Sequence, residues 1–179
     1  MKIAAGGQSA DLVDGGEWWR LATSAFVHAD LAHVLFNGLG LWALGQLLEP
    51  RVGGRRLWSW FAIGAVGASV ASHLAGISQS DGASGGAFAW MGAAVALGWR
   101  WRRRFHDDAW LLGPGLWLVA IGNLVLSVVV PRIDAVAHAA GLGLGLILGA
   151  LCREDRPALG VVAGAFLFVC LWGWTVGLP

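Results

Sequence analysis

Six apolar stretches, each close to the length of a helix that crosses a bilayer, divide this chain and leave only short connections between them. A transmembrane helix needs about 20 predominantly apolar residues. The stretches lie near 30–48, 57–78, 83–99, 110–130, 135–151 and 158–177. This pattern predicts an all-α polytopic membrane protein with about six transmembrane helices in one compact bundle.

Composition supports lipid as the solvent around these helices. Hydrophobic residues make up 57% of the chain and charged residues 13%, and a soluble domain of this length could not cover so much apolar surface. A net charge of +1 without a basic stripe argues against a nucleic-acid partner. Cys152 and Cys170 are poorly placed for a disulfide framework and are interpreted as packing residues.

Arginines gather in the loops after the first, third and fifth stretches, and this asymmetry predicts the orientation of the chain. They are Arg51, Arg55, Arg56, Arg100, Arg102, Arg103, Arg104, Arg153 and Arg156. Nine of the twelve basic residues therefore lie on one side, which the positive-inside rule assigns to the cytoplasm. Both chain termini are then expected outside.

Four polar side chains within the apolar stretches require an explanation, because such groups are costly inside a membrane. They are His33, Asn37, Ser84 and His138. With the orientation above, each lies near the start of a helix that runs inward. All four are therefore expected at a similar depth, just below the outer surface.

Ser84 lies in the segment Asp81-Gly82-Ala83-Ser84-Gly85-Gly86, a glycine-rich loop that leads directly into a helix. A hydroxyl at a helix start stands among unpaired backbone N–H groups at the positive end of the helix dipole, where an oxyanion can be held. Gly82 allows a tight turn there. The alternative is a simple helix cap, which is the usual role of serine at such a position.

His138 shares a helix face with Gly141 and Gly145. Small residues four apart let helix backbones approach closely in lipid, so this helix is expected to pack tightly against the one that begins at Ser84. The imidazole could then accept the serine proton as a general base. The alternative is a structural hydrogen-bonding histidine.

His33 and Asn37 are four residues apart and so point from one helix face into the same space. Both can donate hydrogen bonds to an oxyanion, or they could form an interhelical polar clamp. A metal site built from His28, His33 and His138 is a further alternative. No metal is predicted, because the sequence lacks a His-Glu-x-x-His motif and a carboxylate inside the membrane to complete the ligands.

Taken together, the motifs resemble the rhomboid intramembrane serine proteases over about residues 16–151. The matching motifs are Glu17-Trp18-Trp19-Arg20-Leu21, His28, His33-Val34-Leu35-Phe36-Asn37, Gly82-Ala83-Ser84-Gly85 and Ala137-His138-Ala139-Ala140-Gly141. The resemblance implies that Ser84 is the nucleophile and His138 its base, in a dyad without aspartate. It also implies an oxyanion hole lined by His33, Asn37 and the backbone N–H of Ser84, with Gly82 in the same oxyanion and substrate-binding site.

The resemblance implies further roles by position. Trp19 and Arg20 would belong to a loop beside the active site, anchored with help from His28, and Gly141 and Gly145 would bring the two catalytic helices together. The expected activity is cofactor-free cleavage of transmembrane segments of other membrane proteins near the outer face. The expected location is the bacterial inner membrane. The chain divides into a polar segment 1–16, a protease core 17–151 and an additional helix within 152–179.

Two features depart from the family pattern. Phe88 stands where many members have a tyrosine stacked on the base histidine, so stacking without a hydroxyl is expected. The family's usual first helix, before the loop of Trp19 and Arg20, has no counterpart in the sequence given. We therefore expect a truncated or minimal form in which this loop is less firmly held.

Two other functions are compatible with such a bundle. One is a non-proteolytic rhomboid relative that binds transmembrane segments, but such relatives typically lack the serine or the histidine. The other is a small transporter or channel, which would place polar residues in both halves of the bundle and use discontinuous helices. Here the polar residues cluster near one face, which favours the enzyme.

Overall fold

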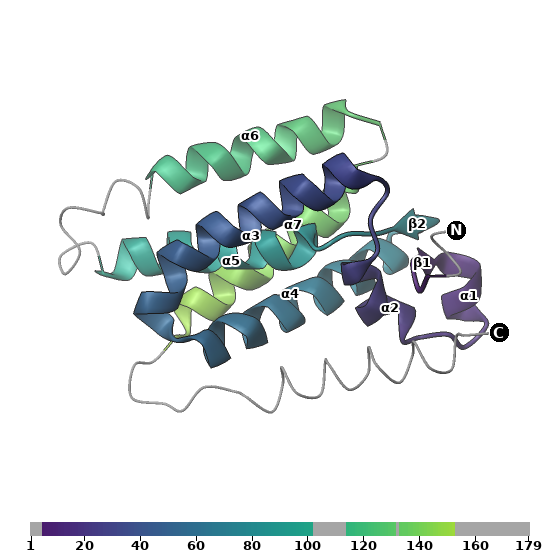
Figure 1. The fold of residues 1–179 in the computed structure, drawn as a ribbon, viewed down its shortest axis with the longest axis horizontal. Coiled ribbons are helices and arrows are strands. Elements are labelled where there is room, and N and C mark those ends of the chain that lie inside the picture. The colour runs from purple at the N-terminus through teal and green to yellow at the C-terminus, as the bar shows by residue number, and fades with distance from the viewer. Residues whose placement is uncertain (1–4, 102–113, 132, 153–179) are drawn as a thin grey trace.

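A computed structural model describes residues 5–101, 114–131 and 133–152 of the chain. The elements, in chain order, are β1 (Gln8–Ser9), α1 (Ala10–Asp14), α2 (Arg20–Thr23), the 3-10 helix η1 (Ser24–Phe26), α3 (Leu31–Val52), α4 (Gly54–Leu74), β2 (Gln79–Ser80), α5 (Ser84–Trp101), α6 (Leu116–Val129) and α7 (Ala135–Ala150). Figure 1 shows the long helices side by side in a bundle, with the short N-terminal elements at one end. The predicted helix at 158–177 and Cys170 lie outside the described residues.

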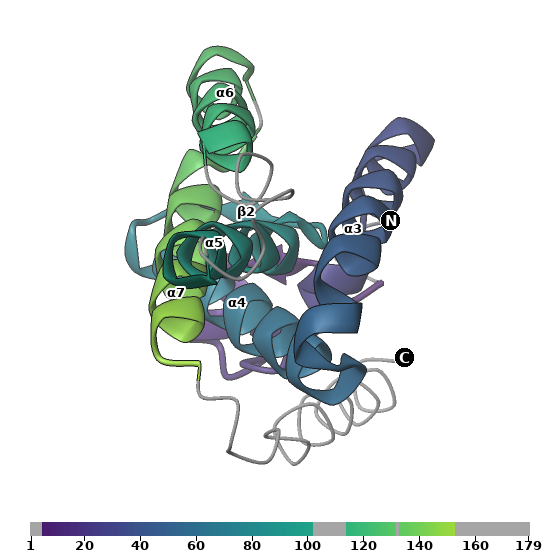
Figure 2. The same cartoon turned by 90° about the vertical axis from the view of Figure 1, so that its left-hand side faces the viewer.

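Helix α5 is the centre of the bundle. It packs against α4 and α7, and its buried residues occupy all sides of the helix from Gly85 to Gly98. Helices α3 and α6 stand at the outside, as Figure 2 shows in the view along the bundle. The described part of α6 buries only Leu116, Ala120 and Ser127. A helix that is apolar all round, such as α5, is typical of a bundle interior.

The outer helices expose large apolar side chains, as expected of surfaces that face lipid. Phe36 on α3 is 76% exposed and Val128 on α6 is 77% exposed. Within the described residues, α3 and α4 are long and apolar enough to cross a membrane, and α6 and α7 are shorter apolar helices. Large exposed apolar side chains in such number are typical of a surface that contacts an apolar partner or a membrane.

Glycines set several helix ends, and this explains where the predicted bounds were wrong. Helix α3 continues past residue 48 to Val52, because the chain first turns at Gly53, whose φ is +81°. Helix α4 then begins at Gly54 rather than near 57, and it ends at Leu74 rather than near 78, just before Gly76 with φ +77°. Such left-handed conformations favour glycine and stop a helix.

The close approach expected between the third and fifth stretches is confirmed as the contact of α5 with α7. A Cβ added to Gly145 would lie 2.0 Å from the carbonyl oxygen of Ala89, and one added to Gly141 would lie 2.4 Å from that of Gly85. Both positions require glycine, because the backbone of α5 occupies the space that a side chain on α7 would need. Gly143, on another face of α7, has nothing within 4 Å of its added Cβ.

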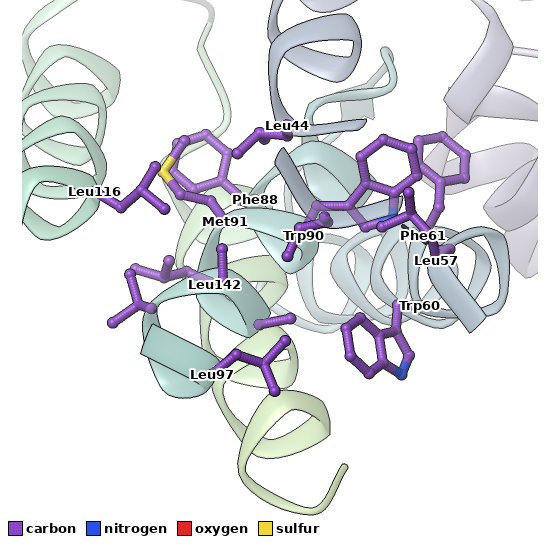
Figure 3. Packing of buried hydrophobic residues seen from close by; sticks show 14 of the residues in the cluster. Leu44, Leu57, Trp60, Phe61, Phe88, Trp90, Met91, Leu97, Leu116 and Leu142 are labelled. Atoms are coloured by element: carbon purple, nitrogen blue, oxygen red, sulfur yellow. Dashed lines mark hydrogen bonds between the residues drawn. The ribbon is translucent and has the colours of Figure 1, made fainter. Parts of the chain in front are cut away.

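An aromatic cluster joins α4 to α5 deeper in the bundle. The Trp90 indole N–H donates to the Leu57 carbonyl at 2.7 Å, and the Trp90 and Phe61 rings lie with centroids 5.9 Å apart. Figure 3 shows these side chains with Met91 and Leu142 in the packed interior. A buried indole N–H needs such a partner, so this bond fixes how α5 sits on α4.

The polar N-terminal segment docks on the bundle through a two-stranded sheet, which is an exception to the all-α prediction. Strand β1 pairs antiparallel with β2, with Gln8 opposite Ser80. Gln8 is only 1% exposed, its N–H donates to the Asp81 carboxylate at 3.1 Å, and its side-chain oxygen accepts from Ser69. Residues 6–9 therefore hold the segment that leads into Ser84.

Candidate active site

The starts of α3, α5 and α7 lie at one end of the bundle (Figure 1), and the predicted polar residues lie within the first two turns of these helices. Ser84 is the first residue of α5 and His138 is in the first turn of α7. The Ser84 hydroxyl oxygen lies 2.8 Å from Nε2 of His138, within hydrogen-bonding distance. Both residues are half-buried.

The His138 ring is held in place by Phe88, one turn after Ser84 on α5. The two rings are stacked, with centroids 4.3 Å apart and an interplanar angle of 19°. The contact is possible because Gly141 lets α7 approach Gly85 closely. Phe88 therefore stacks on the histidine ring as expected, although it lacks the hydroxyl of a tyrosine at this position.

The start of α7 is anchored by Asp134, the N-cap residue. Its carboxylate accepts from the N–H of Ala137 at 2.9 Å and from the Ser72 hydroxyl on α4. Capping by aspartate satisfies N–H groups that have no partner within the helix. Since His138 N–H in turn donates to the Asp134 carbonyl, the cap also fixes the backbone of the histidine.

The side chains of His33 and Asn37 lie over the backbone of Gly82, two residues before Ser84. Gly82 has φ +114°, and a Cβ there would lie 2.7 Å from His33 Nε2 and 3.3 Å from Asn37 Nδ2. Any side chain at this position would fill the space between α3 and the serine loop. The loop thus depends on glycine for its backbone conformation. The absence of a side chain at Gly82 also leaves space beside His33 and Asn37.

Both side chains present N–H donors to this space. His33 Nδ1 accepts from the N–H of Ala29 at 3.3 Å, so the neutral ring carries its proton on Nε2, the atom nearest Gly82. The Asn37 Nδ2 is buried and has no hydrogen-bond partner among the described residues. A buried donor without a partner is destabilising by about 1–3 kcal/mol. This cost has an explanation if a reacting group accepts a hydrogen bond from the donor during catalysis.

The remaining predicted residues support the loop before α3. Arg20 is 6% exposed and donates to the Glu17 carboxylate at 2.7 Å and to the Gly7 carbonyl at 2.9 Å. Trp19 precedes α2, and its carbonyl accepts from Thr23 N–H. His28 contacts the serine loop directly, since its Nε2 accepts from the Ala83 N–H at 3.4 Å.

Two contacts of the site were missed in the sequence analysis. The Gly82 N–H donates to the Ser24 carbonyl at 2.9 Å, which ties the serine loop to η1. The Ser127 hydroxyl of α6 lies 2.6 Å from His138 Nδ1. Neither contact could be predicted from the sequence. Ser24 acts through its backbone carbonyl, and Ser127 is a lone serine in an apolar helix, where such residues usually bond to their own helix.

Comparison with known proteins places the chain among its relatives. A family model described as "Rhomboid domain" matches residues 15–155. Rhomboid protease GluP of Bacillus subtilis (strain 168) is 36% identical over 166 residues, covering 92% of this chain and 31% of that protein. RHOMBOID-like protein 5 of Arabidopsis thaliana is 32% identical over 155 residues, covering 84% and 49%. Rhomboid protease GlpG of Serratia proteamaculans (strain 568) is 34% identical over 136 residues, covering 73% and 46%.

The chain therefore belongs to the rhomboid family, a family of integral membrane proteins built as helical bundles. It spans about a third to a half of the length of these three curated relatives. GluP and GlpG are named as proteases.

Proposed function

We propose that this chain is an intramembrane serine endopeptidase that cleaves transmembrane segments of other membrane proteins with Ser84 and His138. The observation that carries the proposal is the 2.8 Å contact between the Ser84 hydroxyl and His138 Nε2. A nucleophile within hydrogen-bonding reach of a base is the requirement for covalent acyl transfer. Similarity to the proteases GluP and GlpG supports the same reaction.

In this reaction the Ser84 oxygen attacks the scissile carbonyl carbon while its proton passes to His138 Nε2. The peptide C–N bond then breaks, and His138 returns the proton to the leaving amine. Water, deprotonated by the same histidine, attacks the ester carbon; the ester C–O bond then breaks, and His138 returns the proton to the Ser84 oxygen. No cofactor takes part in these steps.

The negative oxygen of the tetrahedral intermediate would lie over the Gly82 loop, where the His33 Nε2–H and the Asn37 amide are directed. Donors fixed in advance stabilise such an oxyanion without reorganisation during the reaction. The start of α5 adds the positive end of a helix dipole at the same place.

The site lies at one end of the bundle, and the arginine-rich loops predict that this end is the outer face of a bacterial inner membrane. We propose a bundle of about six transmembrane helices, with 158–177 as the last. Substrates would then be cut near the outer surface. The described α3 and α6 surfaces would face lipid and the incoming substrate segment.

The test uses the purified chain in detergent with a fluorophosphonate probe and a model transmembrane substrate. Ser84→Ala should abolish both labelling and cleavage, and His138→Ala should lose nearly as much because the two residues act as a unit. Ser78→Ala, in the exposed segment before the same loop, is the matched serine control and should label normally. Labelling and cleavage retained in folded Ser84→Ala would refute the nucleophile. A wild-type chain that binds substrate without cutting it would indicate the non-proteolytic alternative.

A further inference from the structure

Ser127 reaches the His138 ring on the nitrogen that Ser84 does not use. It lies near the end of α6 and is 4% exposed, one of the few buried residues in the described part of that helix. Its hydroxyl oxygen is 2.6 Å from His138 Nδ1, and the Ser84 oxygen is 2.8 Å from Nε2. The imidazole thus lies between two serine hydroxyls from two different helices.

The proton arrangement follows from a third contact. The Ser127 oxygen is also 2.6 Å from the Asn123 carbonyl, one turn earlier on α6. A carbonyl oxygen can only accept, so the single hydroxyl proton of Ser127 must point to Asn123. Toward His138 the Ser127 oxygen can therefore only accept, and Nδ1 must carry the ring proton.

We propose that Ser127 is a positioning residue that fixes His138 in the Nδ1–H tautomer. In a neutral imidazole with its proton on Nδ1, Nε2 has a free lone pair and can accept the proton of Ser84. The opposite tautomer would direct an N–H at the nucleophile and could not act as a base. The inference rests on the proposed function, since it concerns how the same histidine is prepared.

The contact between Ser127 and His138 Nδ1 also stabilises the charged imidazolium that forms during the reaction. After Nε2 takes the serine proton, the imidazolium has two N–H groups, and Nδ1–H keeps its acceptor on Ser127. Chymotrypsin-like triads use a carboxylate at this point. Here the nearest carboxylate on α7, Asp134, is bonded to Ala137 and Ser72. Phe88 stacks on the ring face and offers no acceptor.

Ser127→Ala tests the hydroxyl, and Ser127→Thr tests rescue, because threonine keeps an oxygen that can bond one turn back along a helix. We expect Ser127→Ala to lower kcat about tenfold with KM unchanged, equivalent to about 1.4 kcal/mol. Ser127→Thr should recover most of that loss. Ser59→Ala is the control, because Ser59 is a buried serine on α4 that donates in the same way to the Arg55 carbonyl at 2.8 Å.

A second measurement reads the tautomer without any turnover. In protein with ¹⁵N-labelled histidine, the NMR resonances of the His138 ring can be assigned by their absence in His138→Ala. They should show a protonated Nδ1 and an unprotonated Nε2. Ser127→Ala should shift this population toward Nε2–H, whereas Ser127→Thr and Ser59→Ala should not. The combination of a kcat effect with a tautomer shift is not expected from a merely structural serine.

Three outcomes would overturn the inference: an unchanged tautomer in Ser127→Ala, a kcat equal to wild type, or a loss that threonine does not recover. The proposed function is judged separately by labelling of Ser84. If wild type labels and Ser84→Ala does not, while Ser127→Ala keeps its rate and tautomer, only the role of Ser127 fails. If Ser84→Ala still labels, the proposed function itself fails.

Discussion

Gly145→Ala is the substitution that tests most directly how the helix packing builds the site. Gly145 is two turns after His138 on α7 and lies against Ala89 of α5. The alanine Cβ would be 2.0 Å from the Ala89 carbonyl oxygen and 2.7 Å from its Cα. These neighbours are backbone atoms of a buried helix, so no side chain can rotate away to make room.

The required movement exceeds what the Ser84–His138 contact can absorb. Ordinary van der Waals contact begins at 3.4 Å, so α5 and α7 must separate by about 1.4 Å at this point. The 2.8 Å hydrogen bond weakens once it lengthens beyond about 3.2 Å. Overpacking of this kind typically destabilises by about 1–3 kcal/mol, and a 1 Å misplacement of reacting groups can reduce a rate by about a hundredfold.

Gly143→Ala is the matched control, since it lies on the same helix and its added Cβ meets nothing within 4 Å. Cleavage rate and melting temperature should be measured for both variants in one detergent. We expect Gly143→Ala to equal or slightly exceed the wild type in stability, because alanine is the better helix former. We expect Gly145→Ala to lose about a hundredfold in rate and to melt earlier. Equal behaviour of the two variants would refute the argument that backbone contact sets the geometry of the site.

Three further predictions concern the remaining parts of the site and the orientation of the chain. Asn37→Ala should lower kcat by about a hundredfold through loss of one oxyanion donor. If folded Asn37→Ala were as inactive as Ser84→Ala, Asn37 would have a role beyond the oxyanion hole. Phe88→Leu should lower the cleavage rate about threefold to tenfold, because the stack on His138 is lost, and Phe88→Tyr should not. In a cysteine-free background, Arg55→Cys should resist an impermeant thiol reagent in intact cells and Ser78→Cys should react; the reverse result would overturn the topology.

The main features of the site could be predicted because the membrane makes polar residues conspicuous. Ser84, His138, His33 and Asn37 stand out from apolar surroundings, and the arginine distribution predicts that they lie at one depth. The structure brings Ser84 to His138 and brings His33 with Asn37 to Gly82. The stack of Phe88 on the histidine was expected only from the family resemblance, in which a tyrosine takes this position one turn after the serine.

Other features could not be predicted because their signals are local and weak. A two-residue strand such as Gln8–Ser9 is too short to show the alternation that identifies strands. Ser127 has the same appearance as any serine that bonds back to its own helix, and only the fold shows that its oxygen also reaches His138. The helix bounds near Gly53 and Gly76 depend on single backbone conformations.

The pairing of β1 with β2 has a consequence for the order in which the protein acquires its final shape. Gln8 bonds to Asp81 across 73 positions of sequence, immediately before the loop at Gly82, where φ is +114°. Glycine adopts many backbone conformations, so contacts from outside the loop are needed to hold this one. Contacts between such distant positions form late, because the entropy of closing a long loop must first be overcome. Helices α3, α4 and α5 can therefore pack together before the loop at Gly82 is held, and we expect the contact between Ser84 and His138 to be completed late in folding.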